Sequence, residues 1–216
     1  MVLPSRVPLF PLPNVVLFPG VPLPLHVFEA RYREMVRDAQ VGESLIGMVL
    51  LKGEWRKDYY GRPQIFEVGC AGRLVSVETL PDGRSNILLH GAREFAIVRE
   101  VGDRSYREAE VAWRPTVAGA TVGADQRRRV GALIERFLAH GAESPARKLL
   151  HDPSLSDELL TNFFCYALEL SPLEKQGLLE APSLLARAQQ LCDVLEFRLE
   201  ELRLAGKPPS GGDRWH

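Results

Sequence analysis

Three large aromatic side chains stand in a strongly polar segment between Lys52 and Gln64. Trp55, Tyr59 and Tyr60 are surrounded there by arginine, lysine, aspartate and glutamate, with a glycine near each end of the segment. Large rigid rings with polar tips are the side chains that contact surfaces use most. We therefore interpret this loop as a candidate partner-binding surface. The alternative is that the rings fold back as a lid over the end of the β-structure beside them.

Other residues with chemical potential do not form a recognisable catalytic pattern. The sequence contains no G-x-x-x-x-G-K-[ST], no G-x-S-x-G and no H-E-x-x-H motif. We interpret the histidines as structural, because His26 has no carboxylate or nucleophile close to it in the sequence and the adjacent His151 and Asp152 would point apart. The three cysteines are far apart and odd in number, which argues against a disulfide scaffold or a zinc site. We expect a non-enzymatic protein with no catalytic residue, cofactor or metal.

The elements that would carry the loop begin with a proline-punctuated apolar stretch. Val15–Phe18 predicts a buried strand, and Pro19-Gly20 predicts a tight turn. Apolar residues then alternate over 21–27, which predicts a second strand, and its two prolines place that strand at a sheet edge or a bulge. The spacing next changes to that of a helix, with these residues on its buried face: Phe28, Tyr32, Met35, Val36 and Ala39.

Further strands follow as far as Trp113. The pattern predicts six or seven in all, mostly antiparallel, with the helix inserted after the second or third. Asp82-Gly83 is a strong hairpin signal, and Gly91 is expected to break a strand. Pairing is expected to resume over 65–70, and the later predicted strands cover these ranges: 45–51, 74–78, 86–90, 95–101 and 109–113.

The second half of the chain has helical periodicity. The small, glycine-containing run at 117–123 is the expected seam, so we predict a β-domain over 1–118, a linker over 119–125, a helical subdomain over 126–205 and a disordered tail over 206–216. Ser171 and Glu174 form a capping box that should start one helix, and Pro182 should open the last.

Three segments carry a family resemblance, in family order. LPNVVLFPGVPLPLHVFEARYREM, EVGCAGRLVSVETLPDGRSNILLHGAREFAI and SPLEKQGLLEAPSLLARAQQL resemble the Lon N-terminal (LON substrate-binding) domain of the bacterial, S16-related Lon proteases. The chain is most similar to stand-alone proteins built from that domain, without its ATPase and protease modules. The resemblance implies an α+β protein: an N-terminal PUA-like, partly open β-barrel with one inserted helix, followed by a C-terminal helical bundle.

The resemblance also implies a function. We expect a module that recognises extended or unfolded polypeptide, or an adaptor for a protease or chaperone partner in protein turnover. The residues that we expect to contact the partner lie in the proline strand and the aromatic loop: Val21, Leu23, Trp55, Tyr59 and Tyr60. Composition is that of a soluble globular protein with no membrane span, so we expect a cytoplasmic location.

Two alternatives stay open. The PUA-like class includes RNA binders, and Arg127-Arg128-Arg129 is a basic run, although it can equally be the solvated first turn of a helix. A net charge of -1 and the lack of interleaved basic and aromatic residues make nucleic acid an unlikely partner. A small-molecule enzyme that uses the barrel mouth is the least favoured alternative, because no pair of converging titratable groups is evident.

Overall fold

A computed structural model describes residues 3–115, 120–140, 145–152 and 154–205. The chain divides into two compact units: Met1–Gly119 with Thr161–Glu180, and Ala120–Leu160 with Ala181–His216. Residues 161–180, which the sequence assigns to the helical subdomain, are thus grouped with the strands, while the domain boundaries at 118 and 126 stay predictions. The expected tail over 206–216 and position 119 of the linker lie outside the described residues.

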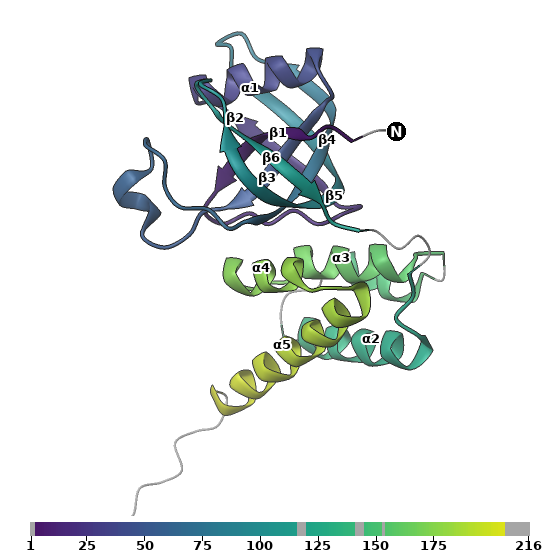
Figure 1. Cartoon of the computed structure of the whole chain (residues 1–216). Coiled ribbons are helices and arrows are strands. Elements are labelled where there is room, and N and C mark those ends of the chain that lie inside the picture. Colours follow the sequence, from purple (N-terminus) through teal and green to yellow (C-terminus); the bar gives the residue numbers. More distant parts are fainter. Residues whose placement is uncertain (1–2, 116–119, 141–144, 153, 206–216) are drawn as a thin grey trace, which may run out of the picture. The chain divides into compact units, whose positions relative to one another are not determined.

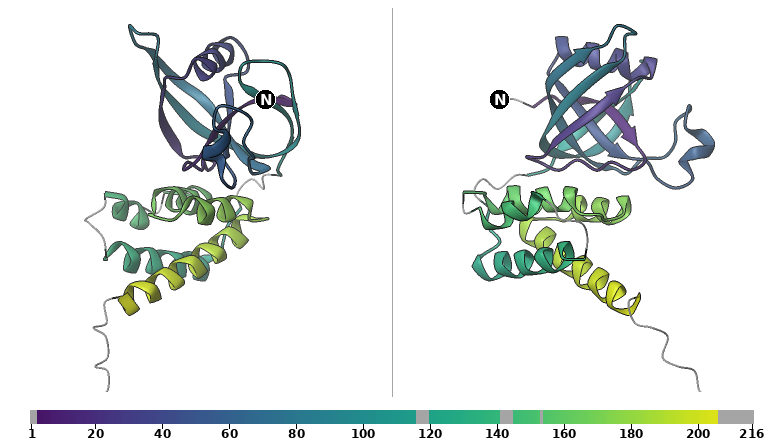
Figure 2. Two further views of the ribbon diagram at one scale, coloured as in Figure 1. Left: turned by 90° about the vertical axis from the view of Figure 1, so that its left-hand side faces the viewer. Right: turned by 180° about the vertical axis from the view of Figure 1, so that it is seen from behind.

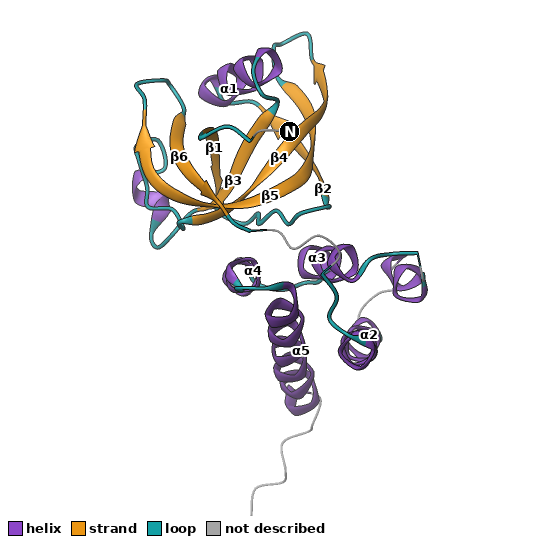
Figure 3. Cartoon of the chain, turned by 45° about the vertical axis from the view of Figure 1, so that its right-hand side comes forward, coloured by secondary structure: helices purple, strands orange, loops and turns teal. Residues whose placement is uncertain are grey.

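Six strands form one sheet, in the order β2-β5-β4-β3-β1-β6. Because β5 also pairs with β6, the pairings of β5, β4, β3, β1 and β6 run in a closed circuit, and β2 is joined to β5 alone (Figure 3). The β1–β3 pair is parallel and the others are antiparallel, as the sequence mostly predicts. The strand bounds are β1 Arg6–Leu12, β2 Pro22–Val27, β3 Leu45–Leu50, β4 Val68–Thr79, β5 Ser85–Val101 and β6 Arg107–Trp113.

The predicted first strand at Val15–Phe18 is wrong. The strand lies earlier, at β1, and 15–18 has no strand pairing. Its last three residues are nevertheless almost fully buried, so they are apolar because they fill the core and not because they pair. The turn prediction is confirmed: the Val21 amide donates to the Phe18 carbonyl at 3.2 Å, and Gly20 has φ of 80°.

The proline strand is confirmed as an edge strand, since β2 has a single neighbour. The predicted break at Gly91 is wrong: β5 runs without interruption from Ser85 to Val101. Gly91 lies instead beside a register shift, where Gly72 is opposite Gly91 but Ala71 is opposite Arg93. A β-bulge absorbs the extra residue and bends the strand, so the glycine marks a local irregularity within one long strand.

The inserted helix α1 (Ala30–Val41) buries four of the five predicted residues: Tyr32, Met35, Val36 and Ala39. Phe28 precedes the helix and is 60% exposed, so its assignment to the buried face is wrong. One core cluster of the strand unit joins β1, β3, β5 and β6 through Val7, Leu9, Leu45, Val49, Phe95, Ala109 and Val111. Burial of these side chains is the main source of stability for the strands.

The second half is helical, as expected. Its elements are α2 (Ala124–Leu138), the 3₁₀ helix η2 (Pro145–His151), α3 (Asp157–Ala167), α4 (Pro172–Glu180) and α5 (Leu184–Ala205) (Figure 1). The capping box at the start of α4 is confirmed: the Ser171 amide donates to Glu174 Oε2 at 2.7 Å, and the Glu174 amide donates to Ser171 Oγ at 3.3 Å. None of the helices in the described ranges is long and apolar enough to cross a membrane.

Buried amides attach the helical part of the first unit to its strands. Asn162 is fully buried and its Nδ2 donates to the Pro19 carbonyl at 3.1 Å. Gln176 is 2% exposed and its Nε2 donates to the Val68 carbonyl at 3.0 Å. Each side-chain amide donates to a backbone carbonyl, which explains how these polar side chains can be buried.

Within the second unit, arginines of the basic run serve structural contacts. Arg127 pairs with Asp157 and also donates to the Leu155 carbonyl at 3.1 Å. Arg129 Nη2 pairs with Glu196 of α5 at 3.0 Å. The run at 127–129 is therefore partly engaged inside this unit, which favours the structural interpretation over a phosphate-binding one.

Candidate functional site

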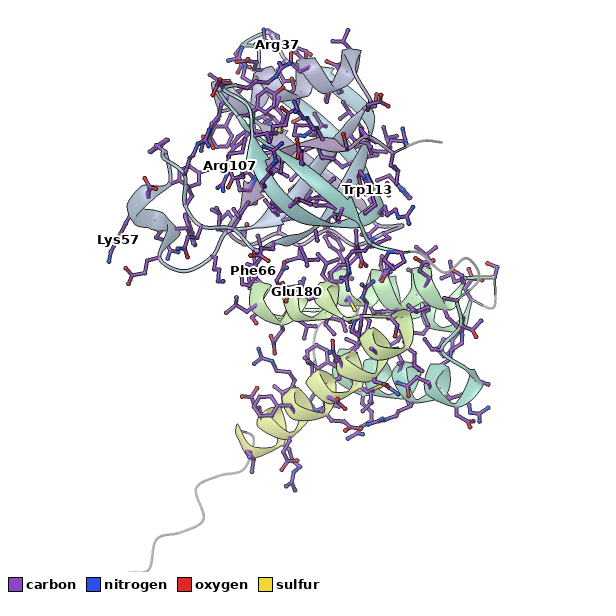
Figure 4. The ribbon with its side chains drawn as sticks, viewed as in Figure 1. Arg37, Lys57, Phe66, Arg107, Trp113 and Glu180 are labelled. Atoms are coloured by element: carbon purple, nitrogen blue, oxygen red, sulfur yellow. The ribbon has the colours of Figure 1, made fainter. Side chains whose placement is uncertain are left out.

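The aromatic loop extends away from the strands and carries its own short helix. In Figure 1 and in the right-hand view of Figure 2 the segment between β3 and β4 projects from the sheet, and residues Trp55–Asp58 form the 3₁₀ helix η1. Lys57 lies on this outlying turn in Figure 4. The sequence correctly separates this polar segment from the strands, because its composition changes abruptly at both ends.

Tyr59 fixes the loop to the start of α1. Its hydroxyl donates to Glu29 Oε1 at 2.7 Å, and Arg31 Nη2 donates to its carbonyl at 3.3 Å. Arg31 also pairs with Glu29 at 3.0 Å, and its guanidinium carbon lies 5.5 Å from the centre of the Tyr59 ring. Partial burial, together with the hydrogen bond to Glu29, raises the pKa of Tyr59. The tyrosine is thus a neutral, half-buried anchor.

The three predicted rings lie together. The Trp55 and Tyr59 centroids are 5.8 Å apart and those of Tyr59 and Tyr60 are 5.2 Å apart, both in edge-on geometry. Tyr60, however, is 87% exposed, whereas Trp55 and Tyr59 are partly covered. The loop therefore combines an anchored base with a projecting ring.

The other two predicted contact residues lie in the core. Val21 is 1% exposed and Leu23 is 3% exposed, so neither side chain is available to a partner in this structure. Their prediction as surface residues fails because alternation identifies one apolar face of a strand but not the side of the sheet that faces solvent. Among the five predicted contact residues, the fully exposed ring is therefore Tyr60 of the loop.

A cleft of about 260 Å³ opens between the loop, α1 and the turn that joins β5 to β6. Tyrosine and arginine dominate its wall, and no aspartate or glutamate lines it. The lining residues are Arg31, Tyr32, Tyr60, Gly61, Arg62, Arg104, Ser105, Tyr106 and Arg107. The arginines are scattered over three segments of the chain and so give no local signal in the sequence.

Carboxylates outside the lining hold three of these arginines in place. Arg104 pairs with Asp38 of α1, and Arg31 pairs with Glu29. Arg107, marked in Figure 4, makes a two-pronged pair with Glu100, and its Nη1 donates to the Pro63 carbonyl at 2.7 Å. Arg107 thereby ties the second end of the loop to the β5–β6 ribbon.

Arg62 differs from the other three. It is exposed and makes no hydrogen bond or ion pair with any residue that the structure describes. Its neighbour Pro63 is buried, so the backbone at this point is fixed while the guanidinium stays in solvent. This cation is the part of the wall that is free to meet a ligand.

Tyr32 and Tyr106 in the cleft stay protonated at neutral pH. Burial raises the pKa of Tyr32 to about 12. Burial and the hydrogen bond that its hydroxyl donates to Asp38 Oδ2, at 2.7 Å, also raise the pKa of Tyr106. Neutral phenols beside arginines provide hydrogen bonds and apolar ring surface, which suits binding more than proton transfer.

His26 and the three cysteines, which could take part in catalysis, lie outside the cleft lining. His26 shares a 2.8 Å hydrogen bond between its Nδ1 and Asn86 Oδ1, and Asn86 donates to Glu78 Oε2 at 3.0 Å. Among the residues described here, no group of three or more histidines, cysteines or carboxylates could hold a metal ion. Cys70, Cys165 and Cys192 are buried, and none of the three is in a disulfide bond.

The sequence pattern of the ATP-dependent protease La (LON) substrate-binding domain matches residues 6–196. The chain belongs to this family. This LON domain is similar to Lon proteases: it is 26% identical over 213 residues to that of Cytophaga hutchinsonii and 29% identical over 210 residues to that of Parabacteroides distasonis. The matches cover 93% and 92% of the chain but 25% of each protease, so this LON domain spans about a quarter of the curated relatives' length.

Solved structures support the LON-domain fold. A Lon N-terminal domain protein from Xanthomonas campestris aligns with a TM-score of 0.63 at 24% identity, covering 94% of this chain and 99% of that one. The N-terminal domain of Mycobacterium avium complex Lon protease aligns with a TM-score of 0.67 at 19% identity, covering 88% and 98%. At these identities the likeness concerns the fold alone.

Proposed function

We propose that this LON domain is a non-enzymatic module that holds extended or unfolded polypeptide segments in protein turnover. Membership of a substrate-binding family supports this function, and the closed circuit of strand pairings supports a PUA-like barrel as the scaffold. Presenting clients to a separate protease in the cytoplasm is a role of the same kind. The observation that carries the proposal is the exposed Tyr60 ring beside the cleft.

The geometry suits a polypeptide for a physical reason. Tyr60 offers a large ring whose orientation is limited by the edge-on contact with Tyr59, so little conformational freedom is lost when a partner covers it. The cleft, at about 260 Å³, lies just below the roughly 300–1,000 Å³ typical of small-molecule sites. A side chain and a short stretch of backbone fit this scale better than a large cofactor.

The test is the affinity for an unfolded client. Fluorescence anisotropy with labelled, reduced and carboxymethylated lactalbumin would compare the wild type, Tyr60→Ala and Phe197→Ala. Phe197, on α5, is 63% exposed and serves as a matched aromatic control in the other unit. We expect Tyr60→Ala to weaken binding about five- to thirtyfold, the effect of removing an interface anchor worth about 1–2 kcal/mol, and Phe197→Ala to have no effect.

Two outcomes would overturn the proposal. One is a wild-type protein that does not bind the unfolded client. The other is an equal loss of affinity in both variants, because that would indicate unspecific apolar adhesion. A labelled single-stranded RNA serves as the comparison ligand: tight, strongly salt-dependent RNA binding without client binding would favour the nucleic-acid alternative.

A further inference from the structure

The arginines in the wall of the cleft have hydrogen-bond donors that the neighbouring carboxylates, outside the lining, leave unused. Arg62 has its whole guanidinium free of partners among the described residues. Arg104 uses Nη1 for Asp38 and is 51% exposed. Arg31 uses Nε and Nη2 for Glu29 and the Tyr59 carbonyl. Three guanidinium groups from three segments therefore line one cleft and keep N–H groups that these contacts do not use.

We propose that this cleft receives a carboxylate group of the bound polypeptide. The inference rests on the proposed function, because it names the chemistry that the same site selects. The planar fork of a guanidinium matches the two oxygens of a carboxylate, and such charge-assisted pairs are about twice as strong as neutral hydrogen bonds. Arg62 of the loop is the principal contact. Arg31 of α1 and Arg104 of the β5–β6 turn orient the carboxylate.

The surroundings of the cleft favour a single carboxylate over a polyanion. At the β5–β6 turn, Asp38 pairs with Arg104, and Glu34 Oε2 accepts a 2.7 Å hydrogen bond from Ser105 Oγ. Glu100 pairs with Arg107. A phosphate backbone that crossed this surface would place further negative charges against these carboxylates. A polypeptide with one acidic group can enter the cleft and leave its neutral remainder on the Tyr60 ring.

The arginines near the cleft have different structural roles, so substituting each of them tests a different point. Arg107 is 10% exposed and holds the loop, so its substitution would disturb the site itself. Arg62→Gln removes only the free cation. Arg37, on α1, is a matched control, since it is exposed, lies in the same unit, is outside the cleft lining and has no hydrogen bond or ion pair with the described residues (Figure 4). Arg62→Lys keeps the charge but removes the fork.

The experiment measures three short peptides of equal length and identical aromatic content by isothermal titration or anisotropy. The first carries an internal glutamate and an amidated end, the second has no acidic residue but a free carboxyl end, and the third has neither. We expect at least one of the first two to bind the wild type about tenfold more tightly than the third, the gain of one charge-assisted hydrogen bond. The first two also distinguish a side-chain source of the carboxylate from a chain terminus.

The variants complete the test. Arg62→Gln should abolish the tenfold preference while binding of the third peptide stays unchanged, Arg62→Lys should retain only part of it, and Arg37→Gln should retain all of it. Added salt should reduce the preference, because the site is open to solvent. Equal binding of all three peptides by the wild type would overturn this inference but leave the proposed function standing. Failure of all three to bind would overturn both, and so would an RNA oligonucleotide that displaces the acidic peptide and binds more tightly.

Discussion

A methyl group added at Gly91 would collide with main-chain atoms. An ideal Cβ at this position would lie 2.0 Å from the Phe18 carbonyl oxygen, 2.8 Å from its carbonyl carbon and 3.2 Å from Pro19 Cα. These atoms belong to the tight turn, so no side-chain rotation can relieve the overlap. Two hydrogen bonds also hold the turn to Gly91: the Gly20 amide donates to the Gly91 carbonyl at 2.8 Å, and the Gly91 amide donates to the Val21 carbonyl at 2.9 Å.

The expected magnitude follows from these contacts. Overpacking a rigid site costs about 1–3 kcal/mol, and each backbone hydrogen bond that is lost costs about 1 kcal/mol. Gly91→Ala should therefore lower the free energy of unfolding by about 3–5 kcal/mol, a large fraction of the 5–15 kcal/mol that a typical domain has. Urea denaturation followed by circular dichroism measures the change.

The same unit supplies a matched control. Gly177 lies inside α4, and nothing comes within 4 Å of an added Cβ there. Gly177→Ala should raise the free energy of unfolding by about 0.5–1 kcal/mol, because alanine loses less conformational entropy than glycine in a helix. A Gly91→Ala protein that stays within about 1 kcal/mol of the wild type would refute the packing argument.

Two further predictions concern buried polar groups. Because the folded state raises the pKa of Tyr32 from 10.0 to about 12, it holds a proton that the unfolded state loses, so the free energy of unfolding should decrease by about 2–3 kcal/mol as pH rises through that interval. Tyr32→Phe should remove this part of the alkaline loss with little change at neutral pH, and an unchanged alkaline profile in urea titrations would show that another group is responsible. Asn162→Ala should cost about 1–3 kcal/mol by leaving the Pro19 carbonyl unpaired, and a denaturation midpoint equal to that of the wild type would contradict this.

Elements with a strong local pattern could be predicted from the sequence, whereas β1 could not. The run that forms β3 and the alternation that forms β2 are recognisable without any knowledge of their neighbours. In β1, Pro8 and Pro11 resemble breakers, but each lies where β1 is paired on one side only, which leaves a side that needs no amide donor: Pro8 is opposite Glu108 of β6, and Pro11 is opposite Val49 of β3. The local sequence of a strand does not determine its pairing register with a distant strand.

Gly91 is a second residue whose role cannot be predicted from the local sequence. Locally it resembles the end of a strand, and the structure uses it where the turn at Pro19-Gly20 approaches the strand most closely. The absence of a Cβ matters because of a segment about 70 residues earlier, as the pairing of Gly91 with Val21 shows. A single sequence identifies the glycine but not the neighbour that requires it.

The candidate site, too, could be predicted from the sequence only in part. The aromatic loop is visible in the sequence because its composition is unusual over a short span. The cationic cleft is not visible, because Arg31, Arg62 and Arg104 come together only after α1, the loop and the β5–β6 turn have taken their places. The burial of Val21 and Leu23 depends likewise on which face of the sheet is covered.

Residues 59–63 explain how one loop can be both anchored and exposed. Tyr59 is held by Glu29 and Arg31, and Pro63 is buried with its carbonyl bound by Arg107. Tyr60 and Arg62, between these anchors, are exposed. The anchors on either side hold the backbone from which Tyr60 and Arg62 project. A ligand that meets Tyr60 and Arg62 therefore encounters a surface that is already ordered, and less of the contact free energy is lost in ordering the loop on binding.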